Sequence, residues 1–221
     1  MIVYNSQKRQ SQQKPVLQIL ILLVLALALS AFSAGPHRVD FVCDGDTVIL
    51  ECGEAVRYIG IDSPEREGEK DPAEPLARES RAFNRSLVEG RAVLLEFGRE
   101  RRDRYGRLLA YVRLKDGTMV NSALVQSGLA AVMPTPPNMA YFGLLLEAQQ
   151  EAMTRGIGLW KRTALREEGP YVGSSRSYRF HSLECPYGRQ ISKKNSVIFD
   201  TLWDAFWEGY SPCSRCVAFP R

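Results

Sequence analysis

The segment RYIGIDSPE, from Arg57 to Glu65, combines one arginine with two carboxylates. Its apolar residues predict the end of a buried strand, and Pro64 predicts a turn, because proline has no N–H to donate to a neighbouring strand. Asp62 and Glu65 are three residues apart, so both side chains reach a common point from one tight turn. Carboxylates beside a fixed arginine suit a metal ion with oxygen ligands that receives a phosphate. A surface turn without this function has the same composition, so both interpretations stay open.

A second turn signal, Asp44-Gly45-Asp46, lies between two predicted strands in residues 39–52. Asp44 is interpreted as the residue that forms the turn. Asp46 follows the glycine and projects from the start of the next strand, where it adds a third carboxylate to the group at the end of the Arg57 strand. The alternative is that Asp46 is another turn residue, which caps backbone N–H groups.

Periodicity along residues 73–160 predicts further strands and three helices. The predicted elements are a helix over about 73–88, strands over 93–97 and 108–114, and helices over 120–129 and 141–155. Leu76, Phe83 and Leu87 recur at helical spacing and are expected in the core. The run RERRDR, residues 99–104, is interpreted as a solvated hairpin. Trp160 is expected to pack on the unit that it ends.

The order of the motifs CDGDTV, VRYIGIDSPE, DRYGRLLAYV, VNSALVQSGLA and GLW resembles staphylococcal nuclease and its thermonuclease relatives over roughly residues 39–160. The resemblance implies an α+β fold, an OB-type five-stranded β-barrel with about three helices. It also implies a calcium-dependent endonuclease that works outside the cytoplasm and hydrolyses phosphodiester bonds of DNA and RNA. In this family the calcium carboxylates would be Asp46 and Asp62, with the backbone carbonyl of Ser63 as a further ligand.

The same resemblance implies catalytic roles for three more residues. Glu65 would orient or deprotonate the attacking water, whereas Arg57 and Arg107 would bind the phosphate and stabilise the charge of the phosphoryl transition state. Two guanidinium groups suit this role because each can bind phosphate oxygens in a bidentate manner. For Arg107, a salt bridge to Asp103, four residues earlier, is the alternative.

One stretch departs from the family pattern. Pro134 and Pro136 stand where the family typically has two tyrosines that pack on the nucleotide. Because stacking on an aromatic ring contributes about 1–3 kcal/mol per base, we expect weaker nucleotide binding or a different strand preference. Tyr105 is a candidate for part of this substrate contact, with packing of its own turn as the alternative.

The C-terminal residues carry a second possible metal site. His181, Cys185, Cys213 and Cys216 form the pattern His-x3-Cys followed by Cys-x2-Cys, a spacing that places thiolates and an imidazole around tetrahedral zinc. A disulfide is the alternative in an oxidising compartment. Cys43 and Cys52 remain, either paired or as free thiols.

The same C-terminal residues also resemble the small metal-binding part of the Ada DNA-repair protein. That resemblance implies a closed structural zinc site in a small α/β module, and contact of this module with nucleic acid is a further hypothesis. The aromatic residues expected in its core are Phe180, Tyr187, Phe199, Trp203 and Phe206.

The N-terminus has the layout of an export signal. Basic residues precede an apolar run over 16–32, and small residues follow it. Residues 1–35 are therefore predicted to be a cleaved signal peptide or a retained membrane anchor. Either places the rest outside the cytoplasm, in the periplasm, secreted, or anchored on the outer side of the inner membrane. A membrane partner is expected only if the segment is retained.

The predicted organisation is a nuclease-like barrel domain over 36–160, a linker over 161–170 and a small zinc-binding module over 171–221. A formal net charge of +4 favours a polyanionic partner such as DNA or RNA. The predicted function is endonuclease. The alternatives are a non-catalytic module of the cell envelope that binds nucleic acid or protein, and an adaptor whose zinc module docks another protein.

Overall fold

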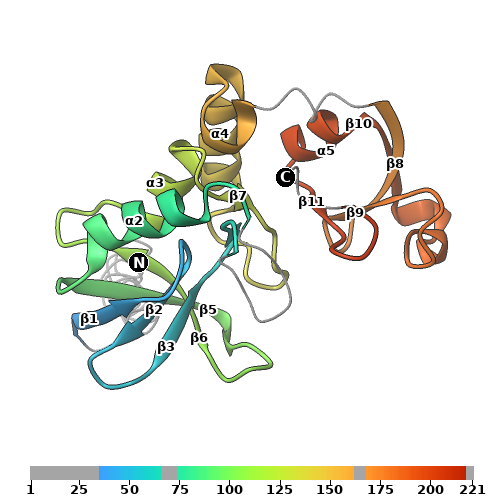
Figure 1. Ribbon diagram of the computed structural model, residues 1–221. Coiled ribbons are helices and arrows are strands. Elements are labelled where there is room, and N and C mark those ends of the chain that lie inside the picture. Colours follow the sequence, from blue (N-terminus) through green and yellow to red (C-terminus); the bar gives the residue numbers. More distant parts are fainter. Residues whose placement is uncertain (1–34, 66–73, 162–167, 218–221) are drawn as a thin grey trace, which may run out of the picture.

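The computed structural model describes residues 35–65, 74–161 and 168–217 (Figure 1). A closed β-barrel carries helices along one side, and a smaller sheet with its own helix follows at the C-terminal end of the chain. The predicted signal or anchor, the predicted start of the first helix at residue 73 and most of the predicted linker lie outside the described residues. Within them, no helix has both the length and the apolar composition needed to span a bilayer.

The barrel has five strands, as predicted, in the order β1-β2-β3-β6-β5. These strands are β1 (His37–Val42), β2 (Thr47–Leu50), β3 (Ala55–Tyr58), β5 (Ala92–Arg102) and β6 (Leu108–Arg113). The β3–β6 pair is parallel and sets Arg57 opposite Leu109, whereas the other neighbours are antiparallel. β5 is longer than predicted because its pairing with β6 continues along the exposed arginine-rich hairpin as far as Arg102.

The strand that was predicted to run from Arg57 to the carboxylates is broken at Gly60. This glycine has a φ of +81°, a left-handed conformation that side chains with a Cβ rarely adopt. The chain therefore leaves the barrel and forms a separate short strand, β4 (Ile61–Asp62), which pairs antiparallel with β7 (Ala131–Val132). This break places Asp62 beside the barrel end.

Three helices lie over the barrel: α2 (Ala77–Val88), α3 (Val120–Gln126) and α4 (Phe142–Arg155), and the short 3-10 helix η2 (Gly158–Lys161) follows α4. Leu76, Phe83 and Leu87 are partly buried and pack against the apolar cores, Phe83 and Leu87 against that of the barrel and Leu76 against the second one. The inner face of α2 is also partly polar. Ser80 is buried on this face, and its hydroxyl donates to the Leu129 carbonyl. Helix α2 therefore packs on backbone groups as well as on apolar side chains.

Asn121 of α3 cross-links the barrel from within. Its side chain is fully buried, with Oδ1 accepting the Val112 N–H and Nδ2 donating to the Ile59 carbonyl, each at 2.9 Å. Because Val112 lies on β6 and Ile59 follows β3, one amide group fixes α3 to two neighbouring strands. Buried backbone groups left without such partners are costly.

The C-terminal residues form a second sheet, in the order β10-β8-β9-β11. Its elements are β8 (Glu168–Ser174), β9 (Arg179–Ser182), the 3-10 helices η4 (Gly188–Gln190) and η5 (Lys193–Asn195), β10 (Ser196–Thr201), α5 (Leu202–Trp207) and β11 (Ser211–Pro212). A reciprocal capping box between Thr201 and Asp204 starts α5. We call residues 168–217 the C-terminal part.

A second apolar core joins the C-terminal part to α4 and η2. Trp160 packs edge-on against Phe206, with 5.4 Å between ring centroids, and Ala152 and Met153 of α4 belong to the same core. Trp160 therefore packs on the C-terminal part, not only on the unit that it ends. The two parts therefore share this apolar core.

Most of the aromatic residues expected in the core of the C-terminal part are there. Phe180, Phe199 and Phe206 are buried and Trp203 is partly buried. Tyr187 is 44% exposed, so our expectation for it is wrong. The reason is that its hydroxyl and ring lie against the guanidinium of Arg215 at the surface.

Replacing Asn121 with leucine tests the internal cross-link. We expect Asn121→Leu to lower the free energy of unfolding by roughly 2–5 kcal/mol, because two buried backbone groups lose their partners. Urea unfolding measures this change. The control is Gln126→Leu, because Gln126 bonds Glu151 at the surface of the same helix, and we expect it to change stability by less than about 1 kcal/mol. Equal losses in the two variants would contradict the role of Asn121.

Candidate active site and metal-binding cluster

The turn between β1 and β2 places two carboxylates at one end of the barrel. Gly45 permits the close packing there, since a Cβ atom on it would lie 1.9 Å from Ser80 Oγ and 2.6 Å from Ser63 Cβ. Oδ1 of Asp44 accepts the Asp46 N–H at 3.0 Å. Oδ2 of Asp46 accepts the Ser63 N–H at 2.6 Å. The turn is thereby joined directly to the segment that follows β4.

Arg57 ties Asp46 to Asp62. Its Nη1 is ion-paired with Asp46 Oδ1, and its Nη2 donates to Asp62 Oδ1 at 2.6 Å. The Asp46 and Arg57 side chains are 2% and 10% exposed, whereas the side chain of Asp62 is 43% exposed. One guanidinium therefore holds a carboxylate of the β1–β2 turn and one of β4, and the group is open to solvent on the Asp62 side. Asp46, Arg57 and Asp62, three of the predicted site residues, therefore lie in contact with one another through Arg57.

Asp44 also belongs to this group, although we had predicted for it only a role in forming the turn. Burial raises the pKa of its carboxyl, while the charges of Arg57 and Arg107 and a hydrogen bond with Thr47 act in the opposite direction. Asp44 thus lies within the field of both arginines. The spacing of two residues between Asp44 and Asp46 was the available signal, because such spacing across a tight turn can bring both side chains to one end of the barrel.

Glu65 lies within the field of the same residues. Partial burial and the charge of Asp44 raise the pKa of Glu65, with a smaller contribution from Asp62, and Arg57 opposes this shift. Its backbone is fixed by Glu74, because the Glu65 N–H donates to Glu74 Oε2 and the Glu65 carbonyl accepts the Glu74 N–H, both at 2.9 Å. No pattern in the sequence indicates this contact with Glu74.

Arg107 lies in the turn between β5 and β6. Its Nε donates to Asp103 Oδ2 at 2.7 Å, so the salt bridge that was the alternative interpretation is present. Burial raises the pKa of Asp44, and the charge of Arg107 is among the smaller influences that oppose this rise. Tyr105 is 69% exposed, and the guanidinium of Arg107 lies 5.5 Å from its ring centroid. The ring is therefore accessible at the tip of the hairpin.

The donor set fits a divalent cation with oxygen ligands. Four carboxylates, those of Asp44, Asp46, Asp62 and Glu65, lie around the guanidinium of Arg57, and Arg107, which also acts on Asp44, is itself paired with Asp103, so negative charge is in excess. Carboxylate oxygens are the ligands that calcium prefers. Burial of Asp46 fixes one side of the group, and exposure of Asp62 leaves room for a ligand on the other side.

A second group of donors lies in the C-terminal part. The ligand atoms of His181, Cys185, Cys213 and Cys216 all lie within 4.8 Å of one another. Cys185 Sγ is 3.4 Å and Cys216 Sγ is 4.0 Å from His181 Nδ1. Ligand atoms around a tetrahedral zinc ion are about 3.5–3.8 Å apart, so this geometry fits zinc. None of the five cysteines forms a disulfide in the structure.

The strands explain why these donors meet. β11 pairs parallel with β9, and the Cys213 N–H donates to the Phe180 carbonyl at 2.9 Å, next to His181. Burial and the charge of Arg179 lower the pKa of His181. A lower pKa keeps the imidazole neutral, which is the form that binds a metal.

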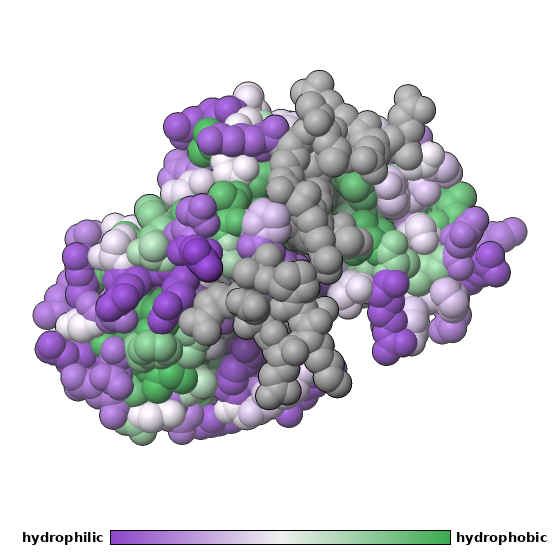
Figure 2. All heavy atoms as spheres, viewed as in Figure 1, coloured by the Kyte–Doolittle hydropathy of each residue, from purple (hydrophilic) through white to green (hydrophobic). Residues whose placement is uncertain are grey.

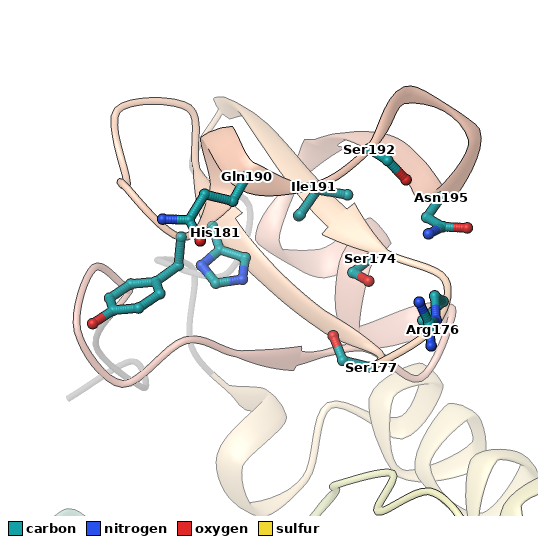
Figure 3. Close-up of a pocket in the computed structure, with 9 residues that line it drawn as sticks. Ser174, Arg176, Ser177, His181, Gln190, Ile191, Ser192 and Asn195 are labelled. Atoms are coloured by element: carbon teal, nitrogen blue, oxygen red, sulfur yellow. The ribbon is translucent and has the colours of Figure 1, made fainter.

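A polar hollow of about 600 Å³ lies beside His181 (Figure 3). It is lined by Ser174, Arg176, Ser177, His181, Tyr187, Gln190, Ile191, Ser192 and Asn195. No carboxylate is among these residues, and Lys193 and Lys194 are exposed on the same segment. In Figure 2, hydrophilic and more apolar residues alternate over the surface of the C-terminal part. The hollow therefore suits ligands with hydrogen-bond acceptors or negative charge.

Comparisons with known proteins agree with this geometry. The family model of the staphylococcal nuclease homologues matches residues 55–162. The thermonuclease of Staphylococcus intermedius is 40% identical over 129 residues, which cover 57% of this chain and 76% of that protein. The thermonuclease of Staphylococcus hyicus is 33% identical, with 60% and 79% covered, and the endonuclease YncB of Bacillus subtilis (strain 168) is 35% identical, with 56% and 61% covered. The chain therefore belongs to the staphylococcal nuclease family.

Proposed function

We propose that this chain is an exported, calcium-dependent endonuclease that hydrolyses phosphodiester bonds in DNA, RNA or both. Its family makes it a hydrolase that acts as a nuclease. The observation that carries the finer proposal is the contact of one buried arginine, Arg57, with both Asp46 and Asp62. The predicted signal or anchor in residues 1–35 supports export.

The Asp46 and Asp62 carboxylates and the Ser63 carbonyl are the proposed calcium ligands. Calcium, when bound there, stabilises negative charge on the phosphoryl oxygens. Arg57 and Arg107 bind the phosphate through their guanidinium groups and stabilise the same charge as it increases in the transition state. The fixed position of Arg57 supports this role, because preorganised donors need no rearrangement during the reaction.

Glu65 orients the attacking water and accepts its proton. The raised pKa of Glu65 supports this role, since a carboxylate with a higher pKa is a better proton acceptor. The bonds between its backbone and Glu74 hold the residue at the edge of the group. Tyr105, exposed beside Arg107, is the proposed contact for a base of the substrate.

A non-catalytic binding module is the other candidate. Such a module needs a basic surface but does not need several carboxylates close to the bound phosphates. The excess of carboxylates around Arg57 would repel a polyanion if no cation were bound there. This charge balance favours the metal-dependent hydrolase.

In the C-terminal part, we propose that His181, Cys185, Cys213 and Cys216 bind a structural zinc ion. All four positions of a tetrahedron are then occupied by the protein, which leaves no open position for catalysis. A part of only about 50 residues gains stability from such a metal, because its own core is small.

Replacing Arg57 with lysine tests its role. We expect Arg57→Lys to lower kcat on single-stranded DNA in calcium by about 10²- to 10³-fold, because lysine cannot contact two groups through one planar fork. The control is Arg102→Lys, since Arg102 contacts Glu54 through both Nη atoms at the surface, and we expect its rate to be unchanged. An unchanged rate in Arg57→Lys would rule out the proposed role.

Replacing Glu65 with glutamine separates the chemical step from calcium binding. We expect Glu65→Gln to lower kcat by about 10²- to 10⁴-fold and to keep its affinity for calcium, because the proposed ligands remain. Calorimetric titration and cleavage assays with calcium or with a chelator provide both values. Glu79→Gln, on the exposed side of α2, should behave as wild type. Chelator-resistant cleavage by the wild-type protein would contradict calcium dependence.

Metal analysis tests the zinc proposal. We expect about one zinc ion per chain in the purified protein and its loss in Cys213→Ser, because removing one ligand weakens a closed tetrahedral site. Cys52→Ser, which removes an exposed cysteine outside the cluster, should keep the metal. A disulfide within the cluster, found by mass spectrometry of metal-free wild-type protein, would contradict the proposal.

A further inference from the structure

Gln149 of α4 joins the barrel part to the C-terminal part. Its side chain is fully buried, with Oε1 accepting the Val132 N–H at 2.7 Å and Nε2 donating to the Phe206 carbonyl at 2.5 Å. A buried amide that is satisfied at both ends holds its two partners at fixed positions, because a shift of either partner leaves a polar group unpaired.

On the barrel side, the partner of Gln149 leads to the proposed calcium site. Val132 lies on β7, whose neighbour in the two-stranded sheet is β4, with Ala131 opposite Asp62. Each of these strands has only two residues, and a sheet of this size is not stable by itself. The position of Asp62 therefore depends on what holds β7 in place.

On the other side, the partner of Gln149 leads to the His/Cys cluster. Phe206 packs edge-on against Phe180, with 5.5 Å between ring centroids. The Phe180 carbonyl accepts the Cys213 N–H, and Phe180 directly precedes His181 in β9. Packed or bonded groups thus run without a break from the cluster, through Phe206 and Gln149, to β7.

We infer that Gln149 is a positioning residue. It fixes β7 to the C-terminal part, and β7 in turn fixes β4 with Asp62, so that the C-terminal part supports the proposed calcium site. The inference rests on the proposed calcium ligands Asp46 and Asp62. It assigns to the C-terminal part a role in calcium affinity, in place of a separate function. Arg179 adds a further contact between the parts, with its Nη2 3.3 Å from Met133 Sδ, one residue beyond β7.

The test compares calcium binding by two variants of the full chain. Gln149→Met removes both hydrogen bonds and keeps a side chain of similar length. We expect its dissociation constant for calcium to rise roughly 3- to 30-fold, as measured by isothermal titration calorimetry. The cleavage rate at saturating calcium should return to nearly the wild-type rate, because Asp62 itself is unchanged.

Gln150→Met is the matched control. Gln150 Nε2 donates to the Trp207 carbonyl of the same helix α5 at 2.9 Å, and the described residues show no bond from it to β7. Its calcium affinity should equal that of the wild type. An unchanged affinity in Gln149→Met, or an equal loss in both variants, would overturn the inference. A wild-type protein that binds no calcium would overturn the proposed function instead.

Hydrogen exchange tests whether the C-terminal part fixes β7 and β4, and it requires no substitution at Gln149. The Met133 N–H donates to the Gly60 carbonyl at 2.9 Å and reports on the contact between the β7 and β4 segments. In Cys213→Ser, we expect this amide to exchange roughly tenfold faster than in the wild type. The Val48 amide in β2 should keep its rate. Unchanged exchange at Met133 would overturn the inference even if Gln149→Met failed to fold.

Discussion

The ion-paired contact of Arg57 with Asp46 and Asp62 is the interaction on which the site depends. Asp46 and Arg57 are almost fully buried, and a buried charge that loses its partner costs about 3–5 kcal/mol. Asp46 and Arg57 therefore require each other, and the pairing of Arg57 with Asp62 brings β4 to the same end of the barrel as the β1–β2 turn and β3. The same guanidinium is the group that we propose to bind phosphate. The side chain that holds the two carboxylates together is thus also the proposed phosphate ligand.

Because the site is built on short elements, buried amide side chains fix these elements to the larger ones. Asn121 bonds β6 and the end of β3, and Gln149 bonds β7 and α5. Asn84 of α2 donates a hydrogen bond from Nδ2 to the Asp44 carbonyl and accepts one at Oδ1 from the Tyr58 hydroxyl. All three are fully buried. They give the turn, the broken strand and the C-terminal part fixed positions that apolar packing alone does not specify.

The sequence predicted those features that depend on local patterns and on motif order. The two strands around Asp44-Gly45-Asp46, the three helices over the barrel and the contact of Asp46 with the Arg57 segment agree with the structure. Motif order was informative because the motifs fall in succession on β2, on β3 and β4, on β6, on α3 and on η2, which the fold brings together. The residues of the His/Cys cluster also come together, as their spacing predicted.

What the sequence did not predict depends on contacts between residues that are distant along the chain. Nothing in the pattern around Gln149 distinguishes a buried cross-link from a surface glutamine of an amphipathic helix. Trp160 was correctly expected to pack, but the choice between barrel and C-terminal part depends on how α4 and α5 meet. Tyr187 was misassigned because the presence of an aromatic residue does not reveal the arginine that holds it at the surface.

An anomalous difference map tests the central claim most directly. Crystals of the protein grown with calcium and a nucleoside bisphosphate would be measured near a wavelength at which calcium scatters anomalously. We expect one peak that is shared by Asp46 and Asp62, with a phosphate bound to Arg57 and Arg107. A calcium peak at another place, with Arg57 still paired to both carboxylates and no phosphate beside it, would contradict the account.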